Sequence, residues 1–191
     1  MRSKAAKAEV DREFDRFVAD HGDSLLRTAY LVAWDLGEAE DLVQECLLRV
    51  ARRWPRVRVM EFPTAYARRI LMNLVLDTSN HRSRQRGELS GPSDAAPVDH
   101  GDPAAVRSFT MVEARTDLLS GLGELAPRQR AVLVLRYFED LTEAQTADAL
   151  GCSIGTVKSS ASQAINRMRQ TSVRDVPQLR IPAHVHKGDN R

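Results

Sequence analysis

The sequence predicts an all-α protein of two small helical domains joined by a flexible linker, with a helix-turn-helix in the C-terminal domain. Three observations support this prediction. Aromatic residues make up only 5% of the chain, and apolar residues recur at helical spacing in two long stretches. A segment rich in proline and glycine separates the two stretches. Within the second stretch, Gly151 lies at a turn between two short helical patterns.

The composition is typical of a globular protein. Of the 191 residues, 42% are hydrophobic and 28% are charged. No apolar run approaches the roughly 20 residues of a membrane span, and the basic N-terminus lacks the apolar segment of a signal peptide. The formal net charge of +2 does not by itself indicate a nucleic-acid partner. Cys46 and Cys152 form no CxxC pair, so we expect buried, reduced thiols and a cytoplasmic location, with no direct membrane insertion.

The pattern divides the chain into four parts. We predict an N-terminal helical domain over 11–86, a linker over 87–110, a C-terminal helical domain over 111–171 and a tail over 172–191. The linker has three prolines at 92, 97 and 103 and few large apolar residues. Such a segment cannot bury enough apolar surface to offset the entropy that it would lose on ordering. It is therefore expected to act as a tether.

In the N-terminal domain, "AEDLVQECLLRVARRW" predicts an amphipathic helix. Leu42, Cys46 and Val50 lie at four-residue spacing and form one buried face. The helix is expected to end near Trp54 and Pro55. From spacing alone, its polar stripe fits either a partner surface or an ordinary solvated face with an i,i+4 ion pair. The stripe consists of four residues: Asp41, Gln44, Glu45 and Arg49.

The next helix is predicted within "FPTAYARRILMNLVLDTSNHRSRQR". Its apolar face contains Ala67, Leu71 and Val75. The remaining side chains suit nucleic acid, because guanidinium groups pair with phosphates, amides bond base edges and a tyrosine ring stacks on an unpaired base. A basic helix end favoured by the helix dipole explains the same residues equally well. The candidates for single-stranded DNA are Tyr66, Arg69, Asn73, Asn80, Arg82 and Arg84.

The stretch "GCSIGTVKSS" has two readings, a phosphate-binding loop or the turn of a helix-turn-helix. A phosphate-binding P-loop needs a lysine directly after its second glycine and a strand before the loop. Here Thr156 and Val157 separate Gly155 from Lys158, and the preceding "TEAQTADAL" has a helical pattern. Both requirements fail, so the P-loop reading is rejected.

The helix-turn-helix reading agrees with the local chemistry. Thr142 and Gln145 form a capping box, Gly151 suits a turn with positive φ, and Ser153 can cap the second helix. Ile154 and Val157 are expected to face inward. A plain αα-hairpin in a bundle remains the alternative. In a helix-turn-helix the second helix enters the major groove. The candidates for duplex contact are Arg130, Ser153, Thr156, Lys158, Ser159, Ser160, Gln163 and Arg167.

Both helical stretches resemble one family. "RQRAVLVLRYFEDLT" and "GTVKS" resemble the promoter-reading C-terminal domain of bacterial extracytoplasmic-function (ECF) RNA polymerase sigma factors of the sigma-70 family. "AEDLVQECLLRV" is similar to the helix by which these factors bind core polymerase, and "YARRILMNLVLD" to the helix that opens the promoter. The sequences of these segments are most similar to those of actinobacterial members. The resemblance covers both domains and leaves out the linker and the tails.

The resemblance implies a role for each candidate residue. Asp41, Gln44 and Glu45 would face the coiled coil of the polymerase's largest subunit. Asn73 would lie at the pocket for a base flipped from the −10 element, where Tyr66 would help to hold the melted strand. The polar face of the second helix would lie in the −35 major groove. The implied partners are core RNA polymerase and promoter DNA, and relatives are often held inactive by an anti-sigma factor.

The main alternative is a stand-alone LuxR-type helix-turn-helix transcription regulator, which carries a similar "GTVK" sequence. Such a regulator would have a receiver or ligand domain in front, whereas the leading stretch here is helical throughout. No HExxH, GxGxxG or metal-spaced cluster occurs in the sequence. We therefore expect no enzyme activity, no catalytic residue, no cofactor, no metal and no small-molecule substrate.

Overall fold

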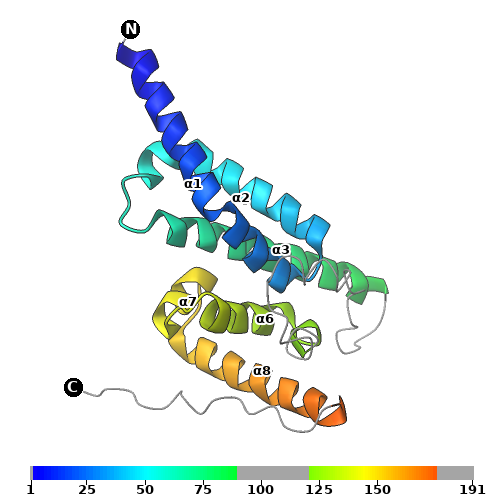
Figure 1. Ribbon diagram of the computed structural model, residues 1–191. Helices are drawn as coiled ribbons and strands as arrows, with labels where there is room; N and C mark the ends of the chain where they lie inside the picture. Colours follow the sequence, from blue (N-terminus) through cyan, green and yellow to red (C-terminus); the bar gives the residue numbers. More distant parts are fainter. Residues whose placement is uncertain (1, 90–120, 176–191) are drawn as a thin grey trace, which may run out of the picture.

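The computed structural model describes residues 2–89 and 121–175, with side chains for 8–82, 84 and 121–170. The N-terminal domain consists of α1 (Arg2–Ala33), α2 (Leu36–Val57) and α3 (Pro63–Leu89). The C-terminal domain contains α6 (Pro127–Leu133), the π-helix η1 (Val134–Phe138), α7 (Glu143–Leu150) and α8 (Ile154–Asp175). The described ranges contain helices and no strand, which confirms the predicted all-α class (Figure 1).

The N-terminal domain is a three-helix unit in which α2 packs against both α1 and α3. Asp35 caps α2, because its carboxylate accepts a hydrogen bond of 2.8 Å from the backbone N–H of Glu38. The predicted apolar face of α2 is buried. Helix α2 ends close to the predicted position, at Val57, two residues after Pro55, and the fully buried side chain of Val57 anchors the last turn.

The C-terminal domain contains the predicted helix-turn-helix, formed by α7 and α8. Thr142 and Gln145 make both bonds of a capping box, and Gly151 ends α7 in the left-handed region at φ +59°. Ser153 caps α8 by accepting a 3.1 Å bond from the backbone N–H of Thr156. Ile154 differs from the prediction: it is 45% exposed, because it lies at the first position of α8, ahead of the buried Val157.

A feature that the sequence did not indicate is the widening of the helix after α6. The backbone N–H of Glu139 bonds to the carbonyl of Val134, five residues earlier, at 3.1 Å, which is the hydrogen-bond pattern of a π-helix. Asp140 follows with φ +50°, which ends the helix. The widened turn lies beside the N-terminal domain, in contact with α1. Short π-helical segments are frequent at functional sites.

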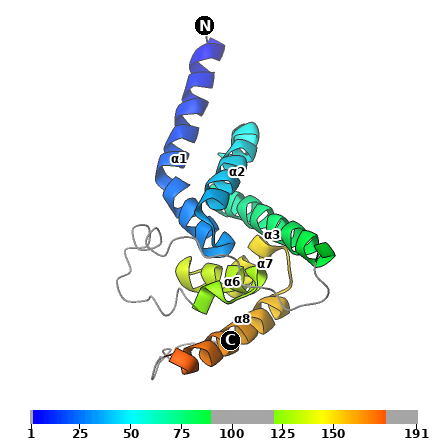
Figure 2. The same cartoon turned by 90° about the vertical axis from the view of Figure 1, so that its right-hand side faces the viewer.

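The two domains lie against each other. Helix α7 packs on α3, and α6 packs on α1, as the two perpendicular views show (Figures 1 and 2). Helix α3 reaches Leu89 and α8 reaches Asp175, so each continues past the predicted domain ends at 86 and 171. The remainder of the predicted linker and tail lies outside the described residues. Within the described ranges, no helix is long and apolar enough to span a membrane.

The two cysteines lie in different environments. Cys46 is fully buried, and its thiol donates a hydrogen bond of 3.3 Å to the carbonyl of Ala67. Burial raises the pKa of Cys46 to about 12, because desolvation penalises the thiolate. Cys152 is half-buried in the turn between α7 and α8, which departs from the helical, buried environment expected for it.

We therefore expect the thiols to react at different rates. At pH 8, iodoacetamide should modify at most one cysteine of the folded chain, Cys152, because Cys46 is both inaccessible and protonated. Mass spectrometry of the intact protein would count the adducts. In denaturant both thiols should react, and rapid modification of Cys46 in the folded chain would contradict its place in the core.

Candidate functional site

The polar stripe predicted on α2 lies on the exposed side of the N-terminal domain. Asp41 and Gln44 are exposed, and Arg49 donates a hydrogen bond of 2.7 Å to Glu45. This i,i+4 ion pair is itself exposed, and such a pair contributes little to folding. The acidic groups are therefore available to a partner.

Sequence reasoning missed Leu48, which is 53% exposed on α2. It lies four residues after Gln44 and three after Glu45, so the three side chains are neighbours on one side of the helix. An exposed leucine surrounded by charged and amide side chains is a common arrangement at the centre of a protein–protein contact. The signal was present in the sequence as an apolar residue outside the buried stripe of the helix.

The exposed face of α3 carries most of the residues predicted to contact single-stranded DNA. Asn73 and Asn80 are exposed and lie about two turns apart on one side of the helix. Tyr66 is half-buried, and its hydroxyl accepts a hydrogen bond of 3.1 Å from Arg53 of α2. Arg69 is about one turn from Asn73 and makes an exposed 3.3 Å ion pair with Asp148 of α7.

The start of α3 adds an aromatic residue that the prediction omitted. Phe62 is 66% exposed and lies directly before the helix, four residues from Tyr66. Val59, in the same α2–α3 loop, is also exposed. Aromatic side chains next to basic ones can stack on unpaired bases, so the loop extends the α3 face.

Arg82 does not belong to this face. It lies nine residues from Asn73, about two and a half turns, which places it on the opposite side of α3. There it donates a 2.7 Å hydrogen bond to Glu38, whose side chain is only 6% exposed. Burial is the main cause of the raised pKa of Glu38, and Arg82 opposes it. Arg82 therefore links α3 to α2, whereas Arg84 remains exposed.

The second helix of the helix-turn-helix presents a polar face away from the rest of the molecule. Ser159, Gln163 and Arg167 are exposed along α8. The structure brings Thr156 and Ser160 to the border of this face, where both are half-buried. The remaining two candidates have intramolecular partners: Ser153 caps α8, and Lys158 makes a 3.4 Å ion pair with Glu143 of α7.

The predicted phosphate contact of Arg130 is wrong for this arrangement, because the side chain is buried and only 2% exposed. Its guanidinium donates to the carbonyl of Leu125 at 2.9 Å and to that of Val32 at 3.1 Å, and lies 5.2 Å from the ring centre of Trp34. Burial lowers its pKa to about 10, so it stays charged at neutral pH. The sequence suggested that Arg130 could reach DNA because it lies in the first helical turn. Residue spacing could not show that the N-terminal domain covers it.

The structure is thus a helical protein of two domains with exposed polar faces on α2, α3 and α8. Comparisons with known proteins agree. Residues 17–87 match the model of Sigma-70 region 2, and residues 115–168 match that of Sigma-70, region 4. The chain is 35% identical to the RNA polymerase sigma-E factor of Streptomyces coelicolor, over 84% of this chain and 86% of that protein. It is 36% identical to the sigma-E factor of Streptomyces antibioticus, over 86% and 87%.

Solved structures show the same fold. The sigma factor RpoE of Bartonella quintana, in complex with the anti-sigma factor NepR, has a TM-score of 0.61 at 23% identity, covering 86% of this chain and 99% of that one. The ECF sigma factor SigJ of Mycobacterium tuberculosis has a TM-score of 0.56 at 27% identity, covering 83% and 53%. The chain belongs to the sigma-70 family of RNA polymerase sigma factors, in its ECF group. It is a sigma factor that acts with core RNA polymerase on promoter DNA to initiate transcription.

Proposed function

We propose that the three exposed faces divide the work of promoter recognition. The acidic stripe of α2, centred on Leu48, binds core polymerase. The α3 face, from Phe62 to Asn80, holds unpaired bases of the −10 element, and the polar face of α8 reads the −35 duplex. The observation that carries this proposal is the exposure of these residues on three helices whose other faces are buried.

In this mechanism the α8 contacts select the −35 sequence and fix the position of the chain on the duplex. The α3 contacts capture bases as they leave the stack. Flipping a base costs about a few kcal/mol, which stacking on aromatic rings and bonding to an amide offset. Asn73 would supply the amide, and Tyr66 and Phe62 the rings. No covalent bond is broken in this mechanism, so the chain acts as a binding protein rather than an enzyme, and we place it in the cytoplasm with polymerase. The matched region 2 does not favour a stand-alone LuxR-type regulator.

An anti-sigma factor is a further partner that we propose by analogy with relatives. One structural neighbour, RpoE of Bartonella quintana, is described as a complex with the anti-sigma factor NepR, and another, CnrH, as a complex with the cytosolic domain of CnrY. Competition between a candidate anti-sigma protein and core polymerase for this chain would test it.

The proposed roles can be tested by following promoter opening directly. Core polymerase and the chain would be mixed with a promoter that carries 2-aminopurine in the −10 element, whose fluorescence rises when the base leaves the stack. We expect a rise that needs both proteins. A rise with core alone, or none with both on any promoter of the source genome, would contradict the proposed function.

The α8 face makes a separate prediction about salt. Replacing Lys158 or Arg167 by alanine should weaken binding to a −35 duplex. If the side chain binds a phosphate, the slope of log affinity against log salt should fall by about one unit for each phosphate that is no longer neutralised. Fluorescence anisotropy across a salt series would measure the slope. Arg16→Ala, an exposed position on α1, is the control, and an equal change in that variant would mean that the effect is only net charge.

A further inference from the structure

The exposed side of α2 carries opposite charges on its two halves. Its first half is acidic and its second half is basic, and Leu48, which is 53% exposed, lies between them. Successive residues of a helix are about 100° apart around its axis, so five side chains fall within about 80° of one another on this side. We call them the bipolar stripe, and they are Asp41, Glu45, Leu48, Arg52 and Arg56.

The helix dipole explains only part of this order of charges. The dipole favours acidic residues in the first turn of a helix and basic residues in the last, and its effect falls off within one turn. In α2 the acidic residue of the first turn is Glu38, and the basic residue of the last turn is Arg56. Three charged residues of the stripe lie farther inside the helix, where the dipole has little effect: Asp41, Glu45 and Arg52.

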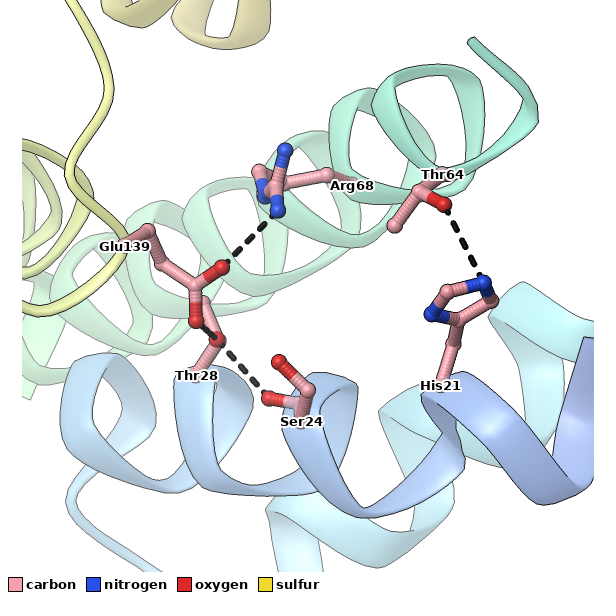
Figure 3. Close-up of polar contacts among 6 residues, drawn as sticks. All are labelled: His21, Ser24, Thr28, Thr64, Arg68 and Glu139. Atoms are coloured by element: carbon pink, nitrogen blue, oxygen red, sulfur yellow. Dashed lines mark hydrogen bonds and ion pairs between the residues drawn. The ribbon is translucent and has the colours of Figure 1, made fainter.

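The charges of the stripe are available to a partner, in contrast to charges elsewhere in the molecule. Arg68 of α3, for example, donates a hydrogen bond of 2.8 Å to Glu139 in a half-buried position (Figure 3). Within the stripe, Glu45 is bound to the neighbouring Arg49, and this exposed pair contributes little. The remaining charged residues of the stripe have no ion-pair partner in the part of the chain that the structure describes: Asp41, Arg52 and Arg56.

A second copy of the chain carries the complementary surface when its α2 runs antiparallel to the first. We place a two-fold axis between Leu48 and Arg49, so that the two Leu48 side chains meet at the axis. Glu45 then lies opposite the partner's Arg52, because both are equally far from the axis. For the same reason Asp41 lies opposite the partner's Arg56. A parallel pairing would instead place like charges opposite each other, which is unfavourable.

The size of this contact sets its strength. The stripe from Asp41 to Arg56 is about 22 Å long at about 1.5 Å per residue, and a helix is about 10 Å wide. Two such stripes bury far less than the about 1,200–2,000 Å² of a stable protein–protein interface. The pairing is therefore expected to be weak and reversible.

We propose that the bipolar stripe binds a second copy of this chain, in a weak antiparallel two-fold dimer that is held by opposite charges and centred on Leu48. The stripe overlaps the surface proposed for core polymerase, so the dimer and the polymerase complex exclude each other. This second part rests on the proposed function of α2. A chain that accumulates in excess of polymerase then covers its own polymerase-binding side chains. Binding to polymerase withdraws monomer and dissociates the dimer by mass action.

Sedimentation of the free chain tests the dimer without polymerase or DNA. We expect the sedimentation coefficient to rise reversibly with protein concentration up to about 1 mM, where weak contacts form. The association should weaken as salt is added, because the Debye length falls from about 10 Å at 0.1 M to about 3 Å at 1 M. No rise at about 1 mM would overturn the proposal. An association that salt strengthens would overturn the pairing of charges.

Exchanging the charges tests the antiparallel arrangement. Asp41→Lys with Glu45→Lys makes the stripe basic throughout, and Arg52→Glu with Arg56→Glu makes it acidic throughout. Each double variant alone should self-associate at least about a hundredfold more weakly, because the pairing now opposes like charges. An equimolar mixture of the two should associate, and the chain with all four substitutions should regain self-association. Failure of both the mixture and the fourfold variant to associate would overturn the arrangement.

Matched controls separate the stripe from general effects of charge and exposure. Asp11→Lys with Asp15→Lys makes the same charge change on the exposed side of α1 and should leave the association intact. Leu48→Lys places two ammonium groups at the axis and should abolish it. Val59→Lys, at a 73% exposed position outside the stripe, should not. Equal loss in the controls, or normal association of Leu48→Lys, would overturn the assignment, and circular dichroism would show that each variant keeps its helices.

The exclusion of polymerase needs a separate measurement. Core polymerase added to a dimer that carries donor and acceptor dyes on its two copies should abolish the energy transfer between them. A polymerase complex that retains two copies of the chain in contact would overturn the exclusion. If the chain failed to act with polymerase, the sedimentation of the free chain would still report on the dimer.

Discussion

Replacing both Asp41 and Glu45 by lysine is expected to abolish binding to core RNA polymerase. Each substitution turns an exposed acidic group on α2 into a basic one, and opposing like charges across an interface cost several kcal/mol. Two such reversals weaken binding by about a thousandfold or more. Biolayer interferometry with immobilised core polymerase would measure the affinity.

The fold should survive this change. The substitution breaks only the exposed ion pair of Glu45 with Arg49, so thermal stability should stay close to that of the wild type. Asp11→Lys with Asp15→Lys is the charge-matched control, because both residues are exposed on α1 at the same four-residue spacing. Normal polymerase binding by the α2 variant would mean that the stripe is only a solvated face. An equal loss of polymerase binding by the α1 variant would mean that net charge alone determines the affinity.

The second large effect is expected from Asn73→Ala, which should impair promoter opening and leave polymerase binding intact. Asn73 is exposed at the middle of the α3 face, and an amide that bonds a base edge contributes about 1–3 kcal/mol. The equilibrium for opening should therefore fall about 5- to 150-fold. Permanganate reactivity of thymines in the −10 element would report the melted fraction.

A second substitution separates hydrogen bonding from shape. Asn73→Asp keeps the size of the side chain but removes the amide donors and adds a negative charge facing DNA, so it should impair opening at least as much. Both variants should load onto polymerase as the wild type does. A parallel loss of polymerase binding would count against the role of Asn73 in holding a base, as would normal opening in either variant.

Local chemistry made much of the fold predictable. The capping box of Thr142 and Gln145, the left-handed glycine at 151 and the serine cap at 153 are short-range features, and the structure has all three. The apolar face of α2 followed from four-residue spacing, because one side of that helix packs on α1 and α3. Spacing alone did not decide what the exposed faces bind.

Features that depend on contacts between distant residues were not predictable in this way. Arg130 was predicted to contact DNA because it lies at the start of a helix. In the structure Trp34, almost a hundred residues away in sequence, covers it. Arg82 was grouped with the basic end of α3, but Glu38 of another helix holds it on the opposite side. The π-helical turn before Glu139 has no marker in the sequence, and it lies where the two domains meet.

The most direct test of this sigma factor is a reconstituted run-off transcription assay. Sigma-free core polymerase from an actinobacterium would be incubated with the purified chain and a library of genomic promoter fragments, and the transcripts would be sequenced. We expect transcripts that need the chain and whose start sites share two upstream motifs, which would define the −35 and −10 sequences that it reads. Specific DNA binding by the chain alone, with no transcript from any fragment, would contradict the assignment and indicate a stand-alone regulator.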